Sequence, residues 1–261
     1  MTGESILLLS RGSGRVRDVL DTHAERLGAS TSVDSVEVAV YETDPRRELR
    51  PQLATIDAET VYVVPMCVAH THDTLTAIPA ALSALSGRVR YCEPIGGSPA
   101  ITDVLAARAT ELVAGGPDTS LVLVGFGSSS KPYNRQTTDY HATRLRERSD
   151  YAAVHTCYLL QNPAVECVRY NVATSRAVAV PLFVAPTEAT EQRIPDQLEL
   201  GRGGIEYADP LGTHPRVTDA IRGEVQKQRA LGTDETAAPS FEATLTRTQR
   251  PMATDGEGTT E

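Results

Sequence analysis

Two histidines stand one residue apart in the segment "VPMCVAHTHDTLTAIP", directly after a run of apolar residues. In an extended segment the side chains of His70 and His72 would lie on the same side of the backbone. Neutral imidazole is a good ligand for divalent transition metals and titrates near neutral pH, and Asp73 could add a carboxylate oxygen. The pattern indicates a metal-binding and proton-transferring site at His70, His72 and Asp73. The alternative is that both histidines are exposed loop residues that contact only water or backbone.

A second group of candidates also follows apolar runs. Gly-Ser pairs occur near the start and the middle of the chain, and each could present backbone N–H groups to an anion. Arg11 precedes the first pair and would bind a carboxylate rather than a metal ion, because a guanidinium stays protonated. His214, in "PLGTHP", is a further candidate metal ligand. The residues predicted to bind substrate anions are Arg11, Gly12, Ser13, Gly127 and Ser128.

Apolar runs that alternate with amphipathic segments must position these residues. Short continuous runs such as Ile6–Leu9 are typical of strands buried on both faces. In the first half, strands are expected at 6–9, 36–42, 60–68 and 89–96, and helices at 14–28, 45–56, 79–85 and 99–113. The pattern predicts an α/β fold whose parallel four-stranded sheets are flanked by helices, with ligands at the carboxyl ends of the strands.

The chain also repeats itself. Residues 64–82 align without a gap with residues 180–198, and a second pair of blocks, 91–105 and 207–221, has the same offset of 116. Near the start of each half the offset is 118, which pairs His23 with His141 and indicates a packing or capping role for both. We expect two tandem repeats with a cleft between them, residues 1–116 and 117–231, and a disordered acidic, threonine-rich tail, residues 232–261.

Composition excludes several classes of function. The 261 residues carry a formal net charge of −9, which argues against nucleic acid or an anionic membrane as partner. No apolar stretch approaches the ~20 residues of a membrane span, and the N-terminus has no signal-peptide pattern, so a cytoplasmic location is expected. No G-x-x-x-x-G-K-[ST] motif predicts a nucleotide site. The cysteines lack C-x-x-C spacing, and each is expected to be a free thiol that packs as a small buried hydrophobe.

Three blocks in fixed order, "LLLSRGS", "YVVPMCVAHTHDTLTAIP" and "YCEPIG", resemble the class II tetrapyrrole chelatases, and most closely the sirohydrochlorin cobaltochelatases of the CbiX type. The second half repeats them as "VPLFVAPTEATEQRIP" and "DPLGTHP", so the resemblance spans residues 5–225. It implies a two-repeat enzyme that inserts Co²⁺ into a sirohydrochlorin-type tetrapyrrole without ATP, on the route to cobalamin. Ligand types alone also allow Ni²⁺ or Fe²⁺ as the metal substrate. The chain is expected to be a monomer whose halves form a pseudo-dimer, or a weak homodimer.

The sequence departs from the family pattern at both histidine positions. The first family histidine is replaced by Arg11 in the first half and by Phe126 in the second. The second, counted from Pro65, falls on Asp73, with His72 one residue earlier, and on Ala189 in the second half. We assign the metal end of the cleft to His70, His72 and Asp73, with His214 facing them. The alternative is a catalytically degenerate member that binds tetrapyrrole or metal, or partners an active chelatase.

Overall fold

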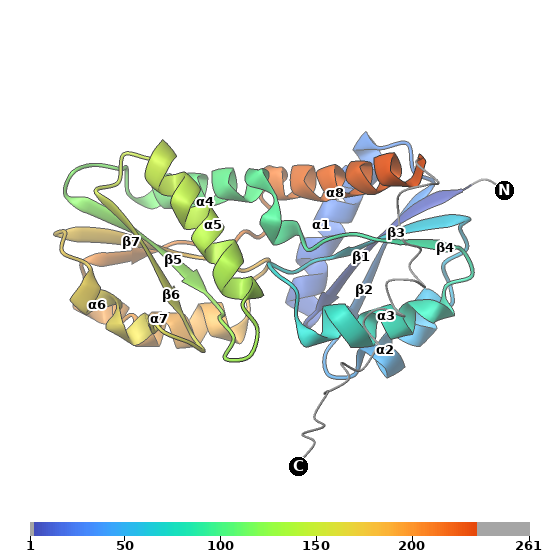
Figure 1. Ribbon diagram of the computed structural model, residues 1–261, viewed down its shortest axis with the longest axis horizontal. Coiled ribbons are helices and arrows are strands. Elements are labelled where there is room, and N and C mark those ends of the chain that lie inside the picture. Colours follow the sequence, from blue (N-terminus) through green and yellow to red (C-terminus); the bar gives the residue numbers. More distant parts are fainter. Residues whose placement is uncertain (1–2, 234–261) are drawn as a thin grey trace, which may run out of the picture.

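The computed structural model describes residues 3–233 and contains two lobes built on the same plan (Figure 1). Each lobe has a four-stranded sheet, with strand order β2-β1-β3-β4 in the first and β6-β5-β7-β8 in the second. All the strand pairs are parallel. The predicted α/β class with two parallel four-stranded sheets is therefore confirmed.

Residues of the first half form the first sheet and four α-helices. Six consecutive residues of the central strand β1, from Ser5 to Ser10, are buried, as expected for a strand with helices on both faces. The strands are β1 (Glu4–Arg11), β2 (Ser35–Tyr41), β3 (Thr60–Pro65) and β4 (Arg88–Tyr91). The helices are α1 (Gly14–Ser30), α2 (Pro45–Leu53), α3 (Ile78–Ala81) and α4 (Pro99–Leu112).

The second half repeats this order of elements. Its central strand β5 is buried along its whole length. The strands are β5 (Thr119–Gly125), β6 (Ala153–Tyr158), β7 (Arg176–Pro181) and β8 (Ile205–Tyr207). The helices are α5 (Tyr133–Arg148), α6 (Val168–Asn171), α7 (Ile194–Gln197) and α8 (Pro215–Thr233).

The last helix of each half is exchanged between the lobes. Helix α4 follows β4 in the chain but packs against α5 and β7 of the second lobe. Helix α8 ends the second half but packs against α1 and β3 of the first lobe. In Figure 1 the two helices run across the same side of the molecule, each over the sheet of the other half, and they also contact each other. Each sheet is therefore covered on this side by two helices, one from each half.

The hydrophobic core reflects this exchange. On the side of α1, α4, α5 and α8, the buried residues form one continuous cluster that includes Leu8 and Val64 of the first sheet and Leu123 and Val180 of the second. On the opposite side each lobe has a separate cluster. The two halves thus share one core on one side and keep their own on the other.

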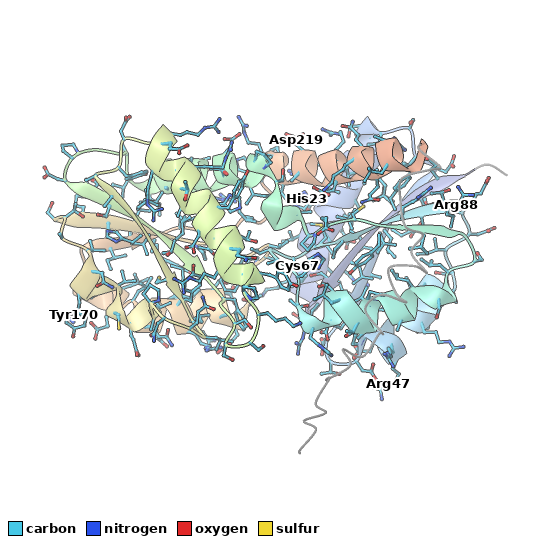
Figure 2. The ribbon with its side chains drawn as sticks, in the orientation of Figure 1. His23, Arg47, Cys67, Arg88, Tyr170 and Asp219 are labelled. Atoms are coloured by element: carbon cyan, nitrogen blue, oxygen red, sulfur yellow. The ribbon has the colours of Figure 1, made fainter. Side chains whose placement is uncertain are left out.

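Two buried histidines fasten the exchanged helices. His23, on α1, lies 2.9 Å from the Thr218 hydroxyl of α8 and 3.0 Å from the Gly212 carbonyl oxygen, close to α8 in Figure 2. His141, on α5, makes the equivalent contacts with Thr102 of α4, at 2.8 Å, and with the Gly96 carbonyl oxygen, at 2.6 Å. A carbonyl only accepts, so Nε2 donates and the neutral ring accepts from threonine at Nδ1. The predicted packing role of this repeated pair is confirmed.

No helix within residues 3–233 is long and apolar enough to cross a membrane. The tail expected at residues 232–261 lies outside the described residues, except for the last two positions of α8. The proposed repeat boundary near residue 116 stays a prediction.

Candidate functional site

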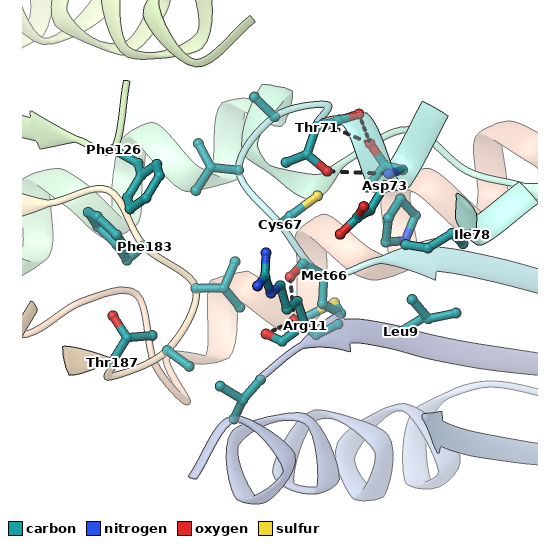
Figure 3. Close-up of a pocket in the computed structure, with 18 of the residues that line it drawn as sticks. Leu9, Arg11, Met66, Cys67, Thr71, Asp73, Ile78, Phe126, Phe183 and Thr187 are labelled. Atoms are coloured by element: carbon teal, nitrogen blue, oxygen red, sulfur yellow. Dashed lines mark hydrogen bonds between the residues drawn. The ribbon is translucent and has the colours of Figure 1, made fainter. Parts of the chain in front are cut away.

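A cavity of about 290 Å³ lies between the lobes, where the carboxyl ends of both central strands meet. Residues from the ends of β1 and β3 line one side, and residues from the ends of β5 and β7 line the other (Figure 3). This is the edge at which parallel α/β sheets bind ligands. The two sides differ in chemistry, and we call them the first-lobe wall and the second-lobe wall.

The first-lobe wall carries both charged groups of the cavity, Arg11 and Asp73, together with the Tyr41 phenol and the Cys67 thiol. The Tyr41 hydroxyl donates to the Asp73 carboxylate at 3.1 Å. Arg11 Nε donates to the Glu42 carbonyl oxygen at 2.9 Å, and its terminal guanidinium nitrogens have no partner within the described part of the chain. In Figure 3 the Asp73 carboxylate and the Cys67 sulfur both point into the cavity beside Arg11.

Burial sets the protonation of two of these groups. The pKa of the Tyr41 phenol is raised by burial and then by the neighbouring Asp73 carboxylate. Burial also raises the pKa of the Cys67 thiol to about 12, although an N–H of Ala69 partly offsets it. Both are neutral at pH 7. The wall therefore offers one anion, one cation and two protonated groups that can donate a hydrogen bond.

The second-lobe wall is mainly apolar, and its polar residues are Asn134 and Thr187. Phe126, at the end of β5, packs edge-to-face on Phe183, with ring centroids 6.1 Å apart and an interplanar angle of 78°. Leu182, Val184 and Ala185 extend this surface. The Phe126 ring is 39% exposed, so it is available to a ligand. Such a wall suits the flat, apolar face of a large ring system.

A short π-helix follows the third strand of each lobe, at Asp73–Ala77 and at Ala189–Arg193. In both, a threonine hydroxyl holds the first turn: Thr74 accepts from the Thr71 N–H at 2.8 Å, and Thr190 accepts from the Thr187 N–H at 2.9 Å. π-helical turns are frequent at functional sites. Here the backbone device is repeated, but its first residue is aspartate in one lobe and alanine in the other.

A tyrosine from the next strand supports each π-helix. The Tyr91 hydroxyl donates to the Thr74 carbonyl oxygen and the Tyr207 hydroxyl to that of Thr190, both at 2.9 Å. These bonds satisfy carbonyl groups whose donor five residues later would be Pro79 or Pro195, which have no N–H. The position of Asp73 at the cavity is thus fixed from two sides.

His70 and His72 are not among the residues that line the cavity. His70 Nε2 donates to Glu93 at 2.8 Å, which lowers the pKa of that carboxyl, and Nδ1 lies 3.2 Å from the Thr74 hydroxyl. The His70 ring also packs edge-to-face on Tyr133 of the other lobe, at 5.9 Å. The His72 ring is exposed and lies 3.3 Å from the Thr76 hydroxyl. Both nitrogens of His70 therefore already have partners.

The expectation of extended backbone at this H-x-H pair was wrong. His72 has helical dihedral angles, φ −59° and ψ −43°, because the threonine-capped π-helix begins directly after it. The two rings do not share one side of a strand. Their assignment as metal ligands stays a prediction, and within residues 3–233 no group of three or more His, Cys, Asp or Glu side chains is arranged to hold a metal ion.

The remaining candidates lie in different places. His214 accepts from the Arg216 N–H at 3.2 Å and is not among the cavity residues; its pKa is lowered by burial and then by Arg108. Gly12 uses its N–H in a 2.9 Å bond to the Tyr41 carbonyl oxygen. Its φ of +153°, and a Cβ position only 2.3 Å from Val16, mean that no larger residue fits. Ser13 begins α1 without a side-chain capping bond. Their substrate-binding role stays a prediction.

The second Gly-Ser pair lies beside a different cavity. Gly127 has φ +79°, and a Cβ there would come within 2.9 Å of Tyr158. The Ser128 N–H donates to the Gln161 side chain at 2.9 Å, and Ser128 lines a polar cavity next to the cleft. The backbone N–H groups of Gly12 and Ser128 both have protein acceptors and are therefore not free to bind substrate.

Sequence reasoning missed Tyr41, Cys67 and Phe183 as members of the site. The available signal was the repeat itself: aligned at an offset of 116, Cys67 lies over Phe183. A polar residue aligned with an apolar one at the end of a central strand marks the cleft. At the ends of the first strands the offset is 115, which places Arg11 over Phe126, and the sequence did single out this pair.

Known proteins share this two-lobed architecture. A probable sirohydrochlorin cobaltochelatase of Halobacterium salinarum is 24% identical over 241 residues, which cover 77% of this chain and 82% of the relative. The sirohydrochlorin chelatase SirB of Bacillus subtilis subspecies spizizenii, solved in complex with cobalt, superposes with a TM-score of 0.69 at 20% identity, over 89% of this chain and 98% of that one.

A third relative is larger than this chain. A multi-domain protein of Deinococcus radiodurans with structural similarity to chelatases superposes with a TM-score of 0.71 at 23% identity. The match covers 88% of this chain but spans only 56% of that protein. At such identities the structural matches show the fold alone. The CbiX family model, however, matches residues 5–112 and again residues 120–228, so the chain belongs to the CbiX family as a two-repeat member and is a distant homologue of sirohydrochlorin cobaltochelatase.

Proposed function

We propose that this chain inserts Co²⁺ into a sirohydrochlorin-type tetrapyrrole, without a nucleotide, as a step toward cobalamin. The observation that carries the proposal is the cavity between the lobes, with a charged wall and an apolar wall facing each other. A tetrapyrrole has the same division, because its ring faces are apolar and its rim bears carboxylates. The substrate of the Halobacterium salinarum relative, given by its name, is of this kind.

The second-lobe wall would hold the macrocycle. Phe126 and Phe183 offer aromatic surface to the ring, and contacts of this kind contribute about 0.5–1.5 kcal/mol beyond the area they bury. Arg11 would bind a rim carboxylate through its unpartnered guanidinium nitrogens. The cavity of about 290 Å³ is at the lower limit of ligand pockets, so a macrocycle held there would extend beyond it.

Asp73 is the residue we place at the metal and the displaced protons. It is the only carboxylate among the cavity residues, and it occupies the position of the second family histidine. A carboxylate can coordinate a divalent ion or accept a pyrrole proton. The Tyr41 hydroxyl would hold it in place. His72, exposed on the rim one residue away, would pass the metal in or carry protons out, and His70 would position the loop through Glu93.

The test is metal insertion by the purified full chain. Sirohydrochlorin and Co²⁺ are mixed with the protein, and formation of cobalt-sirohydrochlorin is followed by its absorbance. A rate that is proportional to protein concentration and above the spontaneous reaction supports the proposal. The same assay with Ni²⁺ and Fe²⁺ identifies the preferred metal. Absence of any tetrapyrrole binding, measured as no shift in the absorbance spectrum, would contradict the proposal.

The second candidate function is a degenerate family member that binds tetrapyrrole or metal without turnover. One observation favours it: neither His70 nor His72 lines the cavity. The resemblance points the same way, because it implies that Arg11 and Phe126 stand in place of the first family histidine. Tight sirohydrochlorin binding together with an insertion rate equal to the spontaneous one would select this function. His72→Ala and Asp73→Asn would then leave that rate unchanged.

A further inference from the structure

A second cavity, of about 470 Å³, opens in the second lobe beside the cleft. It is lined by the loop between β5 and α5 and by the loop that follows β6: Ser128, Ser129, Ser130, Lys131, Pro132, Arg135, Gln161 and Asn162. The first of these loops lies between both cavities, because Phe126 and Asn134 line the cleft while residues 128–132 line the second cavity. A ligand that lies on Phe126 could therefore extend a substituent into this space.

The lining is rich in donors and contains no carboxylate. Lys131 and Arg135 supply positive charge, and serine hydroxyls and side-chain amides supply further N–H and O–H groups. Arg135 shares its charge with Asp139 at 3.5 Å. The Lys131 ammonium has no ion pair or side-chain hydrogen bond within residues 3–233. In a chain with a net charge of −9 and only two lysines, such a space is unusual.

The loop is an addition to the second half. The two histidines that fasten the exchanged helices mark equivalent positions, and so do Arg11 and Phe126 at the strand ends. The stretch from Phe126 to His141 is three residues longer than the stretch from Arg11 to His23. The first lobe continues from Arg11 through Gly12 directly into α1 and has no such loop. The three extra residues fall in the stretch that contains Lys131 and its serine neighbours, and this stretch lines the second cavity.

Hydrogen bonds within the protein hold the loop in place. The Ser128 hydroxyl accepts from the Ser130 N–H at 3.3 Å and from the Lys131 N–H at 3.1 Å, and the Gln161 side chain holds the Ser128 N–H. The lysine side chain is left to the cavity. A carboxylate would gain a charged partner there without displacing an existing acidic one.

We propose that this cavity is an anion subsite that binds a rim carboxylate of the macrocycle through Lys131, with Arg135 and the serine hydroxyls as supporting donors. This inference rests on the proposed tetrapyrrole substrate and extends it. Arg11 would bind the rim from the first lobe and Lys131 from the second, so the macrocycle would be held at opposite edges. Inorganic phosphate or a small polycarboxylate shares the chemistry and would bind more weakly.

The test uses the two lysines of the chain as probe and internal control. The full-length protein is treated with a low level of an amine-acylating reagent, and the modification of Lys131 and Lys227 is measured by mass spectrometry. We expect saturating sirohydrochlorin to slow acylation of Lys131 several-fold and to leave Lys227, on α8, unchanged. The octamethyl ester of the macrocycle should not protect Lys131. Equal labelling of Lys131 with and without bound sirohydrochlorin overturns the proposal.

Matched variants give a second readout. Lys131→Ala should weaken sirohydrochlorin binding about fivefold, as expected for a partly exposed ion pair, and Lys227→Ala should leave it unchanged. The proposed function fails separately, when the wild-type chain binds no sirohydrochlorin. The subsite is then judged with citrate and with inorganic phosphate as probes. Protection of Lys131 by either anion supports it, and no protection by both overturns it.

Discussion

The two walls of the cleft start from the same fold and the same π-helix, and they share three aligned pairs of lining residues: Val68 and Val184, Ala69 and Ala185, Thr71 and Thr187. They differ at the ends of the central strands and at the first residue of the π-helix. The first lobe presents Arg11, Cys67 and Asp73 to the cavity, and the second presents Phe126 and Phe183 in place of the first two; Ala189, which aligns with Asp73, is buried and is not among the cavity residues. The threonine caps and supporting tyrosines are the same in both. The repeat has therefore kept the frame that positions the site and divided the chemistry between its copies.

This division assigns separate tasks that can be tested separately. Changes to Asp73 on the first-lobe wall should act on chemistry, whereas changes to Arg11 and to the second-lobe wall should act on binding. The following predictions are ordered from the largest expected effect to the smallest.

Removing the Asp73 carboxylate should have the largest effect. Asp73→Ala gives the first lobe the residue of the second, and Asp73→Asn keeps the shape of the side chain while removing its charge. We expect both to lower the rate of cobalt insertion about 100-fold or more, because a positioned proton acceptor contributes at least that much. Sirohydrochlorin affinity should change little. Glu188→Gln, at the same loop of the second lobe, is the control, and full activity of Asp73→Asn would remove the carboxylate from the mechanism.

The buried histidines His141 and His23 should make the free energy of unfolding fall at acidic pH. Burial lowers the pKa of His141 from 6.5 to about 4 and also lowers that of His23. The unfolded chain then binds a proton that the native chain does not, so stability falls as pH drops from 6.5 toward 4. His141 alone would contribute about 3 kcal/mol across this window. Denaturant unfolding at several pH values should show a flatter pH dependence for His141→Gln than for His155→Gln, a half-buried control on β6.

The aromatic pair of the second-lobe wall should affect affinity rather than rate. Phe126→Ala removes an exposed ring, so the fold should persist. Loss of about 1 kcal/mol of aromatic contact predicts sirohydrochlorin binding about fivefold weaker, with little change in the rate of the saturated enzyme. Leu160→Ala, also exposed in this lobe but absent from the cavity lining, is the control. A lower saturated rate with unchanged affinity would contradict the division of tasks.

The smallest effect is expected for Arg11. Arg11→Gln keeps a donor but loses the charge, and an exposed ion pair contributes up to about 1 kcal/mol. Sirohydrochlorin affinity should fall a few-fold, and the difference from wild type should shrink as salt concentration rises. Arg47→Gln, on the outer surface of α2, provides the control. Affinity equal to that of wild type at low salt would remove Arg11 from the substrate contacts.

Much of the fold could be predicted from the sequence because its signals are local and occur twice. Buried strands such as Ile6–Leu9 and the equal offsets of the blocks predicted two parallel sheets in tandem. The exchange of α4 and α8 could not be predicted, because helix amphipathicity does not say which sheet a helix covers. His23 and His141 recur at equivalent positions because each contacts the helix that comes from the other half. This could be recognised only from their contacts with Thr218 and Thr102 in the structure.

The site was harder to predict for a similar reason. Spacing in "AHTHD" suggested two rings on one side of an extended segment, but the Thr71–Thr74 hydrogen bonds begin a helix there and turn Asp73, not His72, into the cavity. Tyr41 reaches the site from another strand, which no local pattern reports. Position in the repeat was a better guide than residue type.

The crossing of α4 and α8 also limits how the protein can be taken apart. A break in the backbone between Leu112 and Thr119 would leave each piece with a helix that fits the sheet of the other. Either piece alone would expose the apolar face of a sheet to water, whereas both produced together could interlock and restore the groove. The duplicated chain is in this respect a dimer that cannot dissociate, and only one of its two halves supplies charged side chains to the cavity.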